Sequence, residues 1–423
     1  MAQAISIEGG PSSRAKQWRS TPGVDEPLRA RFGDMGCVDS KSPNPTESCS
    51  IDNPATAVSK GNQSAPASPG SSTQSTRTGS KSDSRMSTSS VASERSRESI
   101  LGRFAFAKGD KALLGEGTSS VCYLGSDVET GDAVAIKVYK PSRKGSATLA
   151  KFKRQVSVLQ ELQRPLERPA EEALWCEELA SADPADLFLK LLDFSKDSDG
   201  EPAPDQADGR LYIVTELAQC TLKDWLRLRS QRSSPLSAES VRKIAGEVVL
   251  ATAWLHAKGF VHLDIKPENI MMCGGRWKLI DMDGCVRAGS VIKMYNSSVS
   301  FSPCYCAPEF ARLVVKGSSM VVKPSMDAWS VGMTIAELVN LCPLLRAKYQ
   351  QISAGQSAQA GTMSFLKWLG AMQAMGLPRR PAWSQEGQFK ALLYTCLLVP
   401  DPEFRNTLAQ SLRAPYFRRQ NMG

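Results

Sequence analysis

Histidine is almost absent from this chain of 423 residues, in which only His256 and His262 occur. The eleven cysteines include no CxxC pair. The sequence therefore excludes a zinc site built from His and Cys at ligand spacing. An odd and unpatterned set of cysteines is typical of a reducing compartment, so we expect an intracellular protein, cytoplasmic or nuclear.

Long apolar segments are missing as well. No run of about eighteen apolar residues occurs, which excludes a transmembrane helix of the usual length. The first residues lack the charged start and apolar centre of a secretion signal, and the start Met-Ala-Gln excludes a myristoylation signal. We therefore expect a soluble, non-secreted protein without a transmembrane segment.

A dense block of basic residues is the third missing feature. The formal net charge is +9, but the Lys and Arg residues that produce it are scattered along the chain. A scattered surplus of this kind is usually a solvated surface, so we expect no nucleic-acid partner. A ligand that bears phosphate groups is equally compatible with the charge.

The N-terminal part of the chain has few aromatic residues. Residues 1–100 are instead rich in Ser, Thr, Pro, Gly and Asn. Such a composition buries too little apolar surface to offset the entropy lost on ordering, so we expect a disordered tail. Its hydroxyl groups invite phosphorylation, although a plain solvated linker explains the composition at least as well.

From Phe104 onward the pattern changes to that of a folded domain. Residues 104–140 alternate apolar and polar positions between turns that contain glycine, which predicts the antiparallel strands of a small sheet. Apolar residues then recur at steps of three and four, namely at Leu149, Phe152, Val156 and Leu159. This spacing predicts one face of a helix.

The second half of the chain is predicted to be mainly helical. Residues 164–185 and 195–210 are rich in Glu, Asp, Pro and Ala and are interpreted as insertions, each followed by a strand-like run. After Leu222 the apolar period is close to 3.6, and Ser237 is placed to cap the start of a helix. The expected fold class is therefore α+β, with a small sheet and one helix followed by a larger helical part.

Two motifs in the expected sheet are suited to binding phosphate. Gly115 and Gly117 lie between strand-like runs, where a missing Cβ lets backbone amides approach phosphate oxygens. Lys137 stands in the apolar strand that follows. Taken singly, the glycine pair is more often a plain hairpin turn, and the lysine is more often a solvent-facing residue.

The run VHLDIKPEN supplies three more polar groups at close spacing. Asp264 could accept the proton of a hydroxyl group, Lys266 could neutralise charge on a transferred phosphoryl group, and Asn269 could bind a divalent cation. A hairpin after Asn269 would bring Asp281 beside it and create the oxygen-rich surroundings that magnesium prefers. An aspartate at the end of a strand is, on its own, most often a turn former.

Together, and in this order, the motifs resemble those of a eukaryotic protein kinase catalytic domain of the Ser/Thr type. The resemblance implies a two-lobed fold over residues 101–418, with the N-lobe at about 104–217 and the C-lobe at about 221–418. Residues 419–423 would be a short C-terminal tail. It also implies ATP as cofactor, with Mg²⁺ or Mn²⁺.

The resemblance assigns a role to each motif residue. Asp264 would be the catalytic base, Lys266 the charge neutraliser and Lys137 the phosphate anchor, while Asn269 and Asp281 would bind the metal. Val121 would be the apolar roof over adenine and Thr215 the gatekeeper. The implied nucleotide-binding residues are Gly115, Glu116, Gly117, Thr118, Ser119, Ser120, Val121, Ala135, Lys137, Thr215, Glu216, Ala218 and Asn269.

Further matches concern the protein substrate. The motif CAPE ends at Glu309, and the resemblance implies that Arg405 pairs with this residue. Asp327 would support the backbone of the catalytic loop. Ser302, at the position of a threonine in Ser/Thr-type kinases, and Lys266 both favour protein substrates that carry Ser or Thr hydroxyls.

Three residues depart from the family pattern. Gln155 stands where the family has a glutamate that pairs with the anchor lysine, and Glu161 lies too far around the helix to replace it. Leu263 replaces an arginine that would contact a phosphorylated activation loop. Asp283 replaces a glycine. These departures favour, as an alternative to an active kinase, a nucleotide-binding pseudokinase that acts as a scaffold or allosteric partner.

Overall fold

The computed structural model describes residues 99–107, 112–117, 119–141, 145–293, 301–375 and 386–418. All of them lie in the compact unit Ser48–Gly423. Residues 1–98 of the tail expected at 1–100, the tail expected at 419–423 and the phosphate contact expected at Thr118 lie outside these residues. None of the described helices is both long and apolar enough to cross a bilayer.

A seven-stranded antiparallel sheet forms the first part of the fold, in the order β1-β2-β4-β5-β7-β6, with β3 paired to β4. Its strands are β1 (Ser99–Ile100), β2 (Phe104–Phe106), β3 (Leu113–Glu116), β4 (Ser120–Asp127), β5 (Ala133–Tyr139), β6 (Leu191–Phe194) and β7 (Tyr212–Glu216). Strand β1 contains the last two residues of the expected tail. A Cβ at Gly125 would lie 2.3 Å from the Ile136 side chain and 2.7 Å from the Ala105 carbonyl oxygen, so only glycine fits there.

One helix, α2 (Gly145–Leu162), packs against this sheet. Phe152 and Val156 are fully buried, and Leu159 is nearly so. The ring of Phe152 meets the ring of Tyr139 on β5 edge to face, with 5.6 Å between the ring centres. The helix predicted from the spacing of these apolar residues is therefore confirmed.

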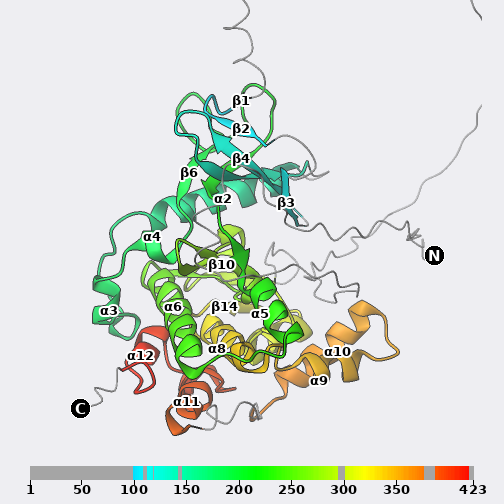
Figure 1. Cartoon of the computed structure of the whole chain (residues 1–423). Helices are drawn as coiled ribbons and strands as arrows, with labels where there is room; N and C mark the ends of the chain where they lie inside the picture. The colour runs from blue at the N-terminus through cyan, green and yellow to red at the C-terminus, as the bar shows by residue number, and fades with distance from the viewer. Residues whose placement is uncertain are drawn as a thin grey trace, which may run out of the picture. The chain divides into compact units, whose positions relative to one another are not determined.

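The remaining elements are mainly helical, and Figure 1 shows α5, α6 and α8 gathered together away from β1, β2 and β4. The helices are α5 (Leu222–Gln231), α6 (Ala238–Ala257), α7 (Pro308–Lys316), α8 (Ser325–Asn340), α9 (Arg346–Ser353), α10 (Ala358–Gly370), α11 (Gly387–Ala391) and α12 (Leu408–Leu412). The Ser237 hydroxyl accepts a hydrogen bond from the Ser240 amide, 3.1 Å away, as the predicted cap of α6. The expected α+β class, with a small sheet and a larger helical part, is confirmed.

Small sheets and single turns position the polar motifs between these parts. Strand β10 (Ile270–Cys273) pairs with β11 (Arg276–Leu279) and with β8 (Cys220–Thr221), while β12 (Val286–Arg287) pairs with β9 (Phe260–Val261). Gly274 and Gly275 connect β10 to β11 with φ of 60° and 83°, as a tight hairpin turn requires. The hairpin predicted between Asn269 and Asp281 is therefore confirmed. Two 3₁₀ turns flank it, η3 (Pro267–Asn269) and η4 (Met282–Gly284).

The first expected insertion forms three short helical turns, η2 (Glu172–Leu174), α3 (Glu177–Ala180) and α4 (Pro184–Leu187). In Figure 1 this segment runs from α2 down along α6 towards α12. Leu174, Cys176 and Leu179 are buried. The Thr407 hydroxyl donates to the Ala173 carbonyl oxygen. We call residues 172–187 the strap, because they join the end of α2 to the helical part.

Candidate active site

Lys137 on β5 lies at the centre of the candidate site. Its ammonium group donates to the amide oxygen of Gln155, at 2.9 Å, and to Oδ1 of Asp281, at 3.0 Å. Burial disfavours the charged lysine, but the surrounding groups, with Asp281 first among them, together outweigh burial and raise the pKa of Lys137. The structure thus brings together the expected phosphate anchor and one expected metal ligand, which are 144 positions apart in the sequence.

The pKa values of two neighbouring carboxylates are shifted in opposite directions. Burial disfavours the charged form of Asp281, but the positive groups around it, with Lys137 first among them, together outweigh burial and lower its pKa. Within the described ranges, no lysine or arginine forms an ion pair with the Asp283 carboxylate, and only its backbone oxygen accepts a hydrogen bond, from Arg154. Burial, and next the negative charge of Asp281, raise the pKa of Asp283.

The loop of residues 262–269 places the other expected catalytic groups. Lys266 donates to Oδ2 of Asp264, at 2.7 Å, and to the hydroxyl oxygen of Ser302, at 2.8 Å. The side-chain amide of Asn269 donates to the backbone oxygen of Asp264, at 2.8 Å. The second carboxylate oxygen of Asp264 is buried and has no hydrogen-bond partner within the described part of the chain.

Asp327 at the start of α8 supports this loop from behind. It is fully buried. Its carboxylate accepts hydrogen bonds from the backbone amides of His262 and Leu263, at 2.6 and 2.8 Å, and contacts the ring of His256 at 3.0 Å. Leu263 has a φ of 68°, a left-handed conformation that costs a non-glycine residue about 1–2 kcal/mol. The predicted support by Asp327 is confirmed, and it holds the strained residue in place.

His262 connects the loop to the strand before Asp281. Its Nε2 lies 2.9 Å from the carbonyl oxygen of Ile280, which can only accept, so Nε2 carries the proton. The other ring nitrogen then accepts from the backbone amide of Asp264, at 3.4 Å. One neutral imidazole therefore links the expected base to the strand end that carries the expected metal ligand.

The glycine loop lies at the junction of β3 and β4. The amide of Gly117 donates to the carbonyl oxygen of Ser120, at 2.9 Å. Lys140 donates to the Glu116 carboxylate, at 2.6 Å, and to the Gly117 carbonyl oxygen, at 2.8 Å, while its backbone amide donates to the carbonyl oxygen of Ser119. Lys140, the residue directly after β5, therefore connects the glycine loop to the end of this strand.

The strand register places Cys122, rather than Val121, on the face of Lys137. Cys122 lies directly opposite Lys137, whereas Val121 lies opposite Val138. Opposite residues of an antiparallel pair share a face, and successive residues alternate between faces. We therefore assign the position expected for Val121 to Cys122. The spacing GxGxxGxV contains the necessary signal, because Ser120 takes the place of the third glycine and the roof residue follows two positions later.

Strand β7 brings the remaining expected residues alongside. Thr215 lies opposite Ala135, so these two residues share the face of Lys137. The Glu216 carboxylate accepts from Lys278, at 2.6 Å, and from the thiol of Cys273, at 3.0 Å. Its backbone amide donates to the Lys190 carbonyl oxygen. Ala218 is the second residue after the end of the strand.

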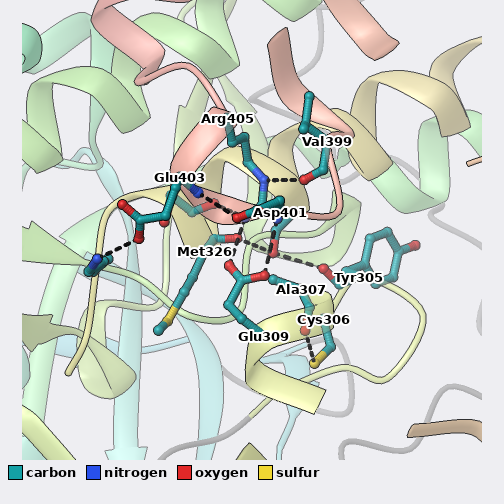
Figure 2. A network of polar contacts seen from close by, with 12 residues as sticks. Tyr305, Cys306, Ala307, Glu309, Met326, Val399, Asp401, Glu403 and Arg405 are labelled. Carbon is teal, nitrogen blue, oxygen red and sulfur yellow. Dashed lines mark hydrogen bonds and ion pairs between the residues drawn. The ribbon is translucent and has the colours of Figure 1, made fainter. Parts of the chain in front are cut away.

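Figure 2 shows Glu309 and Arg405 at the centre of a network of polar contacts. The guanidinium group of Arg405 donates to both carboxylate oxygens, at 2.7 and 3.1 Å. It also donates to the carbonyl oxygens of Ser325, at 2.5 Å, and Val399, at 2.9 Å. Both side chains are almost completely buried. The pairing predicted for these two residues is confirmed.

Comparison with known proteins places this geometry in a family. The family model described as "Protein kinase domain" matches residues 187–417, which is more than half of the chain. The chain belongs to the protein kinase domain family. The matched range includes the catalytic loop, Asp281, Glu309 and Arg405, whereas Lys137 and α2 lie before it.

Individual relatives of this protein kinase are named as kinases or cell division control proteins. Cyclin-dependent kinase F-3 of Oryza sativa subsp. japonica is 30% identical over 222 residues, which are 49% of this chain and 48% of the relative. Cell division control protein 2 homolog D of Antirrhinum majus is 26% identical over 340 residues, 77% of this chain and 97% of the relative. Serine/threonine-protein kinase ICK of Rattus norvegicus is 26% identical over 318 residues, 72% of this chain and 44% of the relative.

These matches also have limits. Of the three relatives, the rat protein ICK is the one whose name includes serine/threonine-protein kinase. The chain spans about half of the length of rice kinase F-3, and the match to rice kinase F-4 covers 27% of that relative. The expected domain bounds, 101–418, stay a prediction, because the family match begins at residue 187.

The three departures from the kinase pattern have distinct structural settings. Gln155 occupies the contact expected of a glutamate, because its oxygen still accepts from Lys137. Leu263 is buried and strained, and Asp327 holds its backbone. Asp283 lies in η4 beside Asp281. Glu161, as predicted, does not substitute for a glutamate at 155, because it pairs with Lys258 and Arg164.

Proposed function

We propose that the chain is an ATP-dependent protein kinase that transfers the γ-phosphoryl group of ATP to Ser or Thr hydroxyls of protein substrates. The observation that carries the proposal is the state of Asp264. Lys266 holds one of its oxygens, and the other is buried without a partner among the described residues. An incoming hydroxyl group would satisfy this oxygen and place its proton within reach of a base.

The residues around Asp264 fit a nucleotide and a divalent cation. Lys137 and the glycine loop would hold the phosphates, while Asp281 and the amide oxygen of Asn269 would bind the cation. No group of three or more His, Cys, Asp or Glu side chains in the described ranges is suited to hold a metal alone. This favours Mg²⁺, which is usually held by one or two carboxylates together with substrate phosphates. The bound cation supplies neutralisation of the charge on those phosphates.

The contact between Lys266 and Ser302 supports Ser/Thr substrates. Lys266 donates to Asp264 and Ser302 together. The ammonium group therefore fixes the base and a residue of the segment before Glu309 in one arrangement. A short aliphatic hydroxyl could approach Asp264 along this edge, and Lys266 would neutralise charge that develops during transfer.

The pseudokinase alternative finds no support in the relatives or in the geometry. Gln155, Leu263 and Asp283 were the residues that favoured it, and Gln155 is the one that contacts the anchor lysine. The oxygen of Gln155 lies 2.9 Å from the ammonium group of Lys137, so the lysine keeps an acceptor on α2. The anchor, the base and both expected metal ligands are all present.

A transfer assay tests the proposal. The full-length chain is incubated with radiolabelled ATP, Mg²⁺ and a generic basic protein rich in Ser and Thr. We expect transfer that Asp264→Asn lowers by about 100-fold or more, the usual contribution of a positioned base. Removal of divalent cations with EDTA should abolish it.

Asp224→Asn is the matched control, because Asp224 lies at the exposed start of α5 and contacts Thr221 and Arg227. It should keep the full transfer rate. Equal incorporation by Asp264→Asn and the natural chain would overturn the proposal. Nucleotide binding without transfer in the natural chain would return the pseudokinase reading.

A further inference from the structure

Lys137, Gln155 and Tyr139 form one hydrogen-bonded network between β5 and α2. Lys137 and Tyr139 are two positions apart on β5 and therefore share a face. Both donate to the same atom, Oε1 of Gln155 on α2, from the lysine ammonium at 2.9 Å and from the tyrosine hydroxyl. Gln155 is 6% exposed and Tyr139 is 4% exposed, so solvent does not compete for these bonds.

The chemistry of these groups fixes the orientation of the amide. An amide oxygen has two lone pairs, and here each receives one donor. The ammonium group of Lys137 has only donors, so it can be met by the oxygen of Gln155 and not by its NH₂ group. A hydroxyl group buried at Tyr139 also needs a partner, and Gln155 supplies it.

Tyr139 is itself held rigidly. Its ring meets the fully buried ring of Phe152 edge to face, with an interplanar angle of 81°. The ammonium group of Lys137 lies 5.4 Å from the centre of the Tyr139 ring. Packing therefore holds the tyrosine ring in one position. The Gln155 side chain has more rotatable bonds, so it depends on its contacts for a single conformation.

A neutral acceptor needs this help more than a carboxylate does. A carboxylate would attract the lysine by charge and could use either oxygen, whereas an amide offers one oxygen and no net charge. The only acidic residue of α2 is Glu161, and it pairs with Lys258 and Arg164. Within the described part of the chain, Gln155 is therefore the residue of α2 that accepts a hydrogen bond from Lys137.

We propose that Tyr139 is a positioning residue for phosphoryl transfer, which holds the Gln155 amide oxygen so that the Lys137 ammonium is directed towards Asp281 and the phosphates of the nucleotide. The inference rests on the proposed kinase function. In this chain, Tyr139 and Gln155 together would orient the Lys137 ammonium group, a role that a single glutamate has in the family pattern.

The test uses kinetics of the full-length chain with MgATP and a protein substrate. Tyr139→Phe removes one oxygen and keeps the ring against Phe152. We expect it to lower kcat/KM for ATP by about tenfold, mainly through kcat, because a misdirected lysine loses most against charge that develops in the transition state. Tyr212→Phe is the matched control, because this buried tyrosine of β7 donates to Asp208, at 2.5 Å, away from Lys137.

Rescue separates positioning from packing. In a Gln155→Glu background the lysine is attracted by charge, so Tyr139→Phe should then cost less than about twofold. An equal loss in both backgrounds, or no loss in the single variant, would overturn the positioning role. Tyr212→Phe should leave kcat unchanged in either background.

The outcome is also distinguishable from a failure of the proposed function. If the natural chain binds MgATP but transfers no phosphate, the same variants are compared by their MgATP dissociation constants, with the same expected rescue. A natural chain that neither transfers nor binds would overturn the kinase proposal itself. Thermal unfolding of Tyr139→Phe, Gln155→Leu and the double variant then tests whether Tyr139 and Gln155 are coupled. Additive changes in the thermal midpoint would overturn the coupling.

Discussion

The carboxylates of Asp283 and Asp281 lie close to each other, and the Lys137 ammonium group forms its ion pair with Asp281. Lys137 pairs with Asp281, which lowers the pKa of Asp281. Asp283 is left with burial and the negative charge of its neighbour, and both raise its pKa. The two residues should therefore affect folding in opposite directions as pH changes.

Replacement of each carboxylate tests this sign. A raised pKa in the folded state means that stability is lost as pH rises above the ordinary carboxyl value of 3.8. Asp283→Asn should therefore raise the thermal midpoint at pH 7 by about 2 °C, with the gain vanishing towards pH 4. Asp281→Asn should lower the midpoint at pH 7, because its lowered pKa contributes stability that is lost as pH falls. Thermal unfolding followed by circular dichroism between pH 4 and 8 measures both, and the same sign for both variants would contradict the assignment.

The register of β4 predicts which side chain limits the nucleotide site. Cys122 shares the face of Lys137, and Val121 does not. Cys122→Phe should raise KM for ATP by about tenfold or more, because the phenyl ring is larger than the thiol and would occupy space beside the expected nucleotide. Val121→Phe should have a clearly smaller effect. A stronger effect at Val121 would show that the original assignment of the roof residue was right.

This one-residue difference shows the limit of sequence reasoning at a single position. The polar motifs could be predicted, because Lys137, Asp264 and Asp281 each stand in a recognisable local pattern. The prediction of the roof residue depended on counting from the third glycine of the motif, and in this chain Ser120 takes the place of that glycine. In a strand, a shift of one position turns the side chain to the other face, and the pairing with β5 is the observation that favours Cys122.

Among the elements, the strap was the least predictable. Its composition indicated an insertion. A segment rich in charged residues and proline does not, however, predict that some of its side chains are buried against α6. Helix α2 and the β10–β11 hairpin could be predicted, because their signals are local apolar spacing and a pair of glycines. The strap is held by distant partners, such as Arg413, which donates to the Trp175 carbonyl oxygen at 2.9 Å.

The strap should contribute to stability through its buried side chains. Leu179 is 1% exposed, so Leu179→Ala should lower the free energy of unfolding by about 2–4 kcal/mol, through lost burial and the cavity left behind. Glu178→Ala, at an exposed position of the same turn, should change it by less than about 0.5 kcal/mol. Urea denaturation measures both. Equal small effects would mean that the strap only lies on the surface.

At the scale of the whole molecule, the pair of Glu309 and Arg405 joins segments 96 positions apart. It connects the start of α7 to the turn η8 (Pro402–Phe404). Two further carbonyl oxygens, of Ser325 and Val399, accept from the same guanidinium group. The pair is buried and bidentate, which is the arrangement in which removal of one partner is most costly.

A double-variant cycle tests this pair. Arg405→Leu should lower the free energy of unfolding by about 3–5 kcal/mol, because it leaves Glu309 as a buried charge without a partner. Glu309→Gln in the same background should recover part of the loss, since a neutral amide is easier to bury. Urea denaturation of the single and double variants measures the coupling. Simple additivity of the two changes would contradict it.

The contact between the strap and Thr407 has a consequence for how the molecule is made. Thr407 donates to the Ala173 carbonyl oxygen across 234 positions of sequence. A ribosome that has just released the strap must therefore add more than two hundred residues before that partner emerges. At a synthesis rate of about 5–20 residues per second, this contact can form only about ten seconds or longer after the strap has been made, whereas α6, along which the strap runs, emerges much earlier.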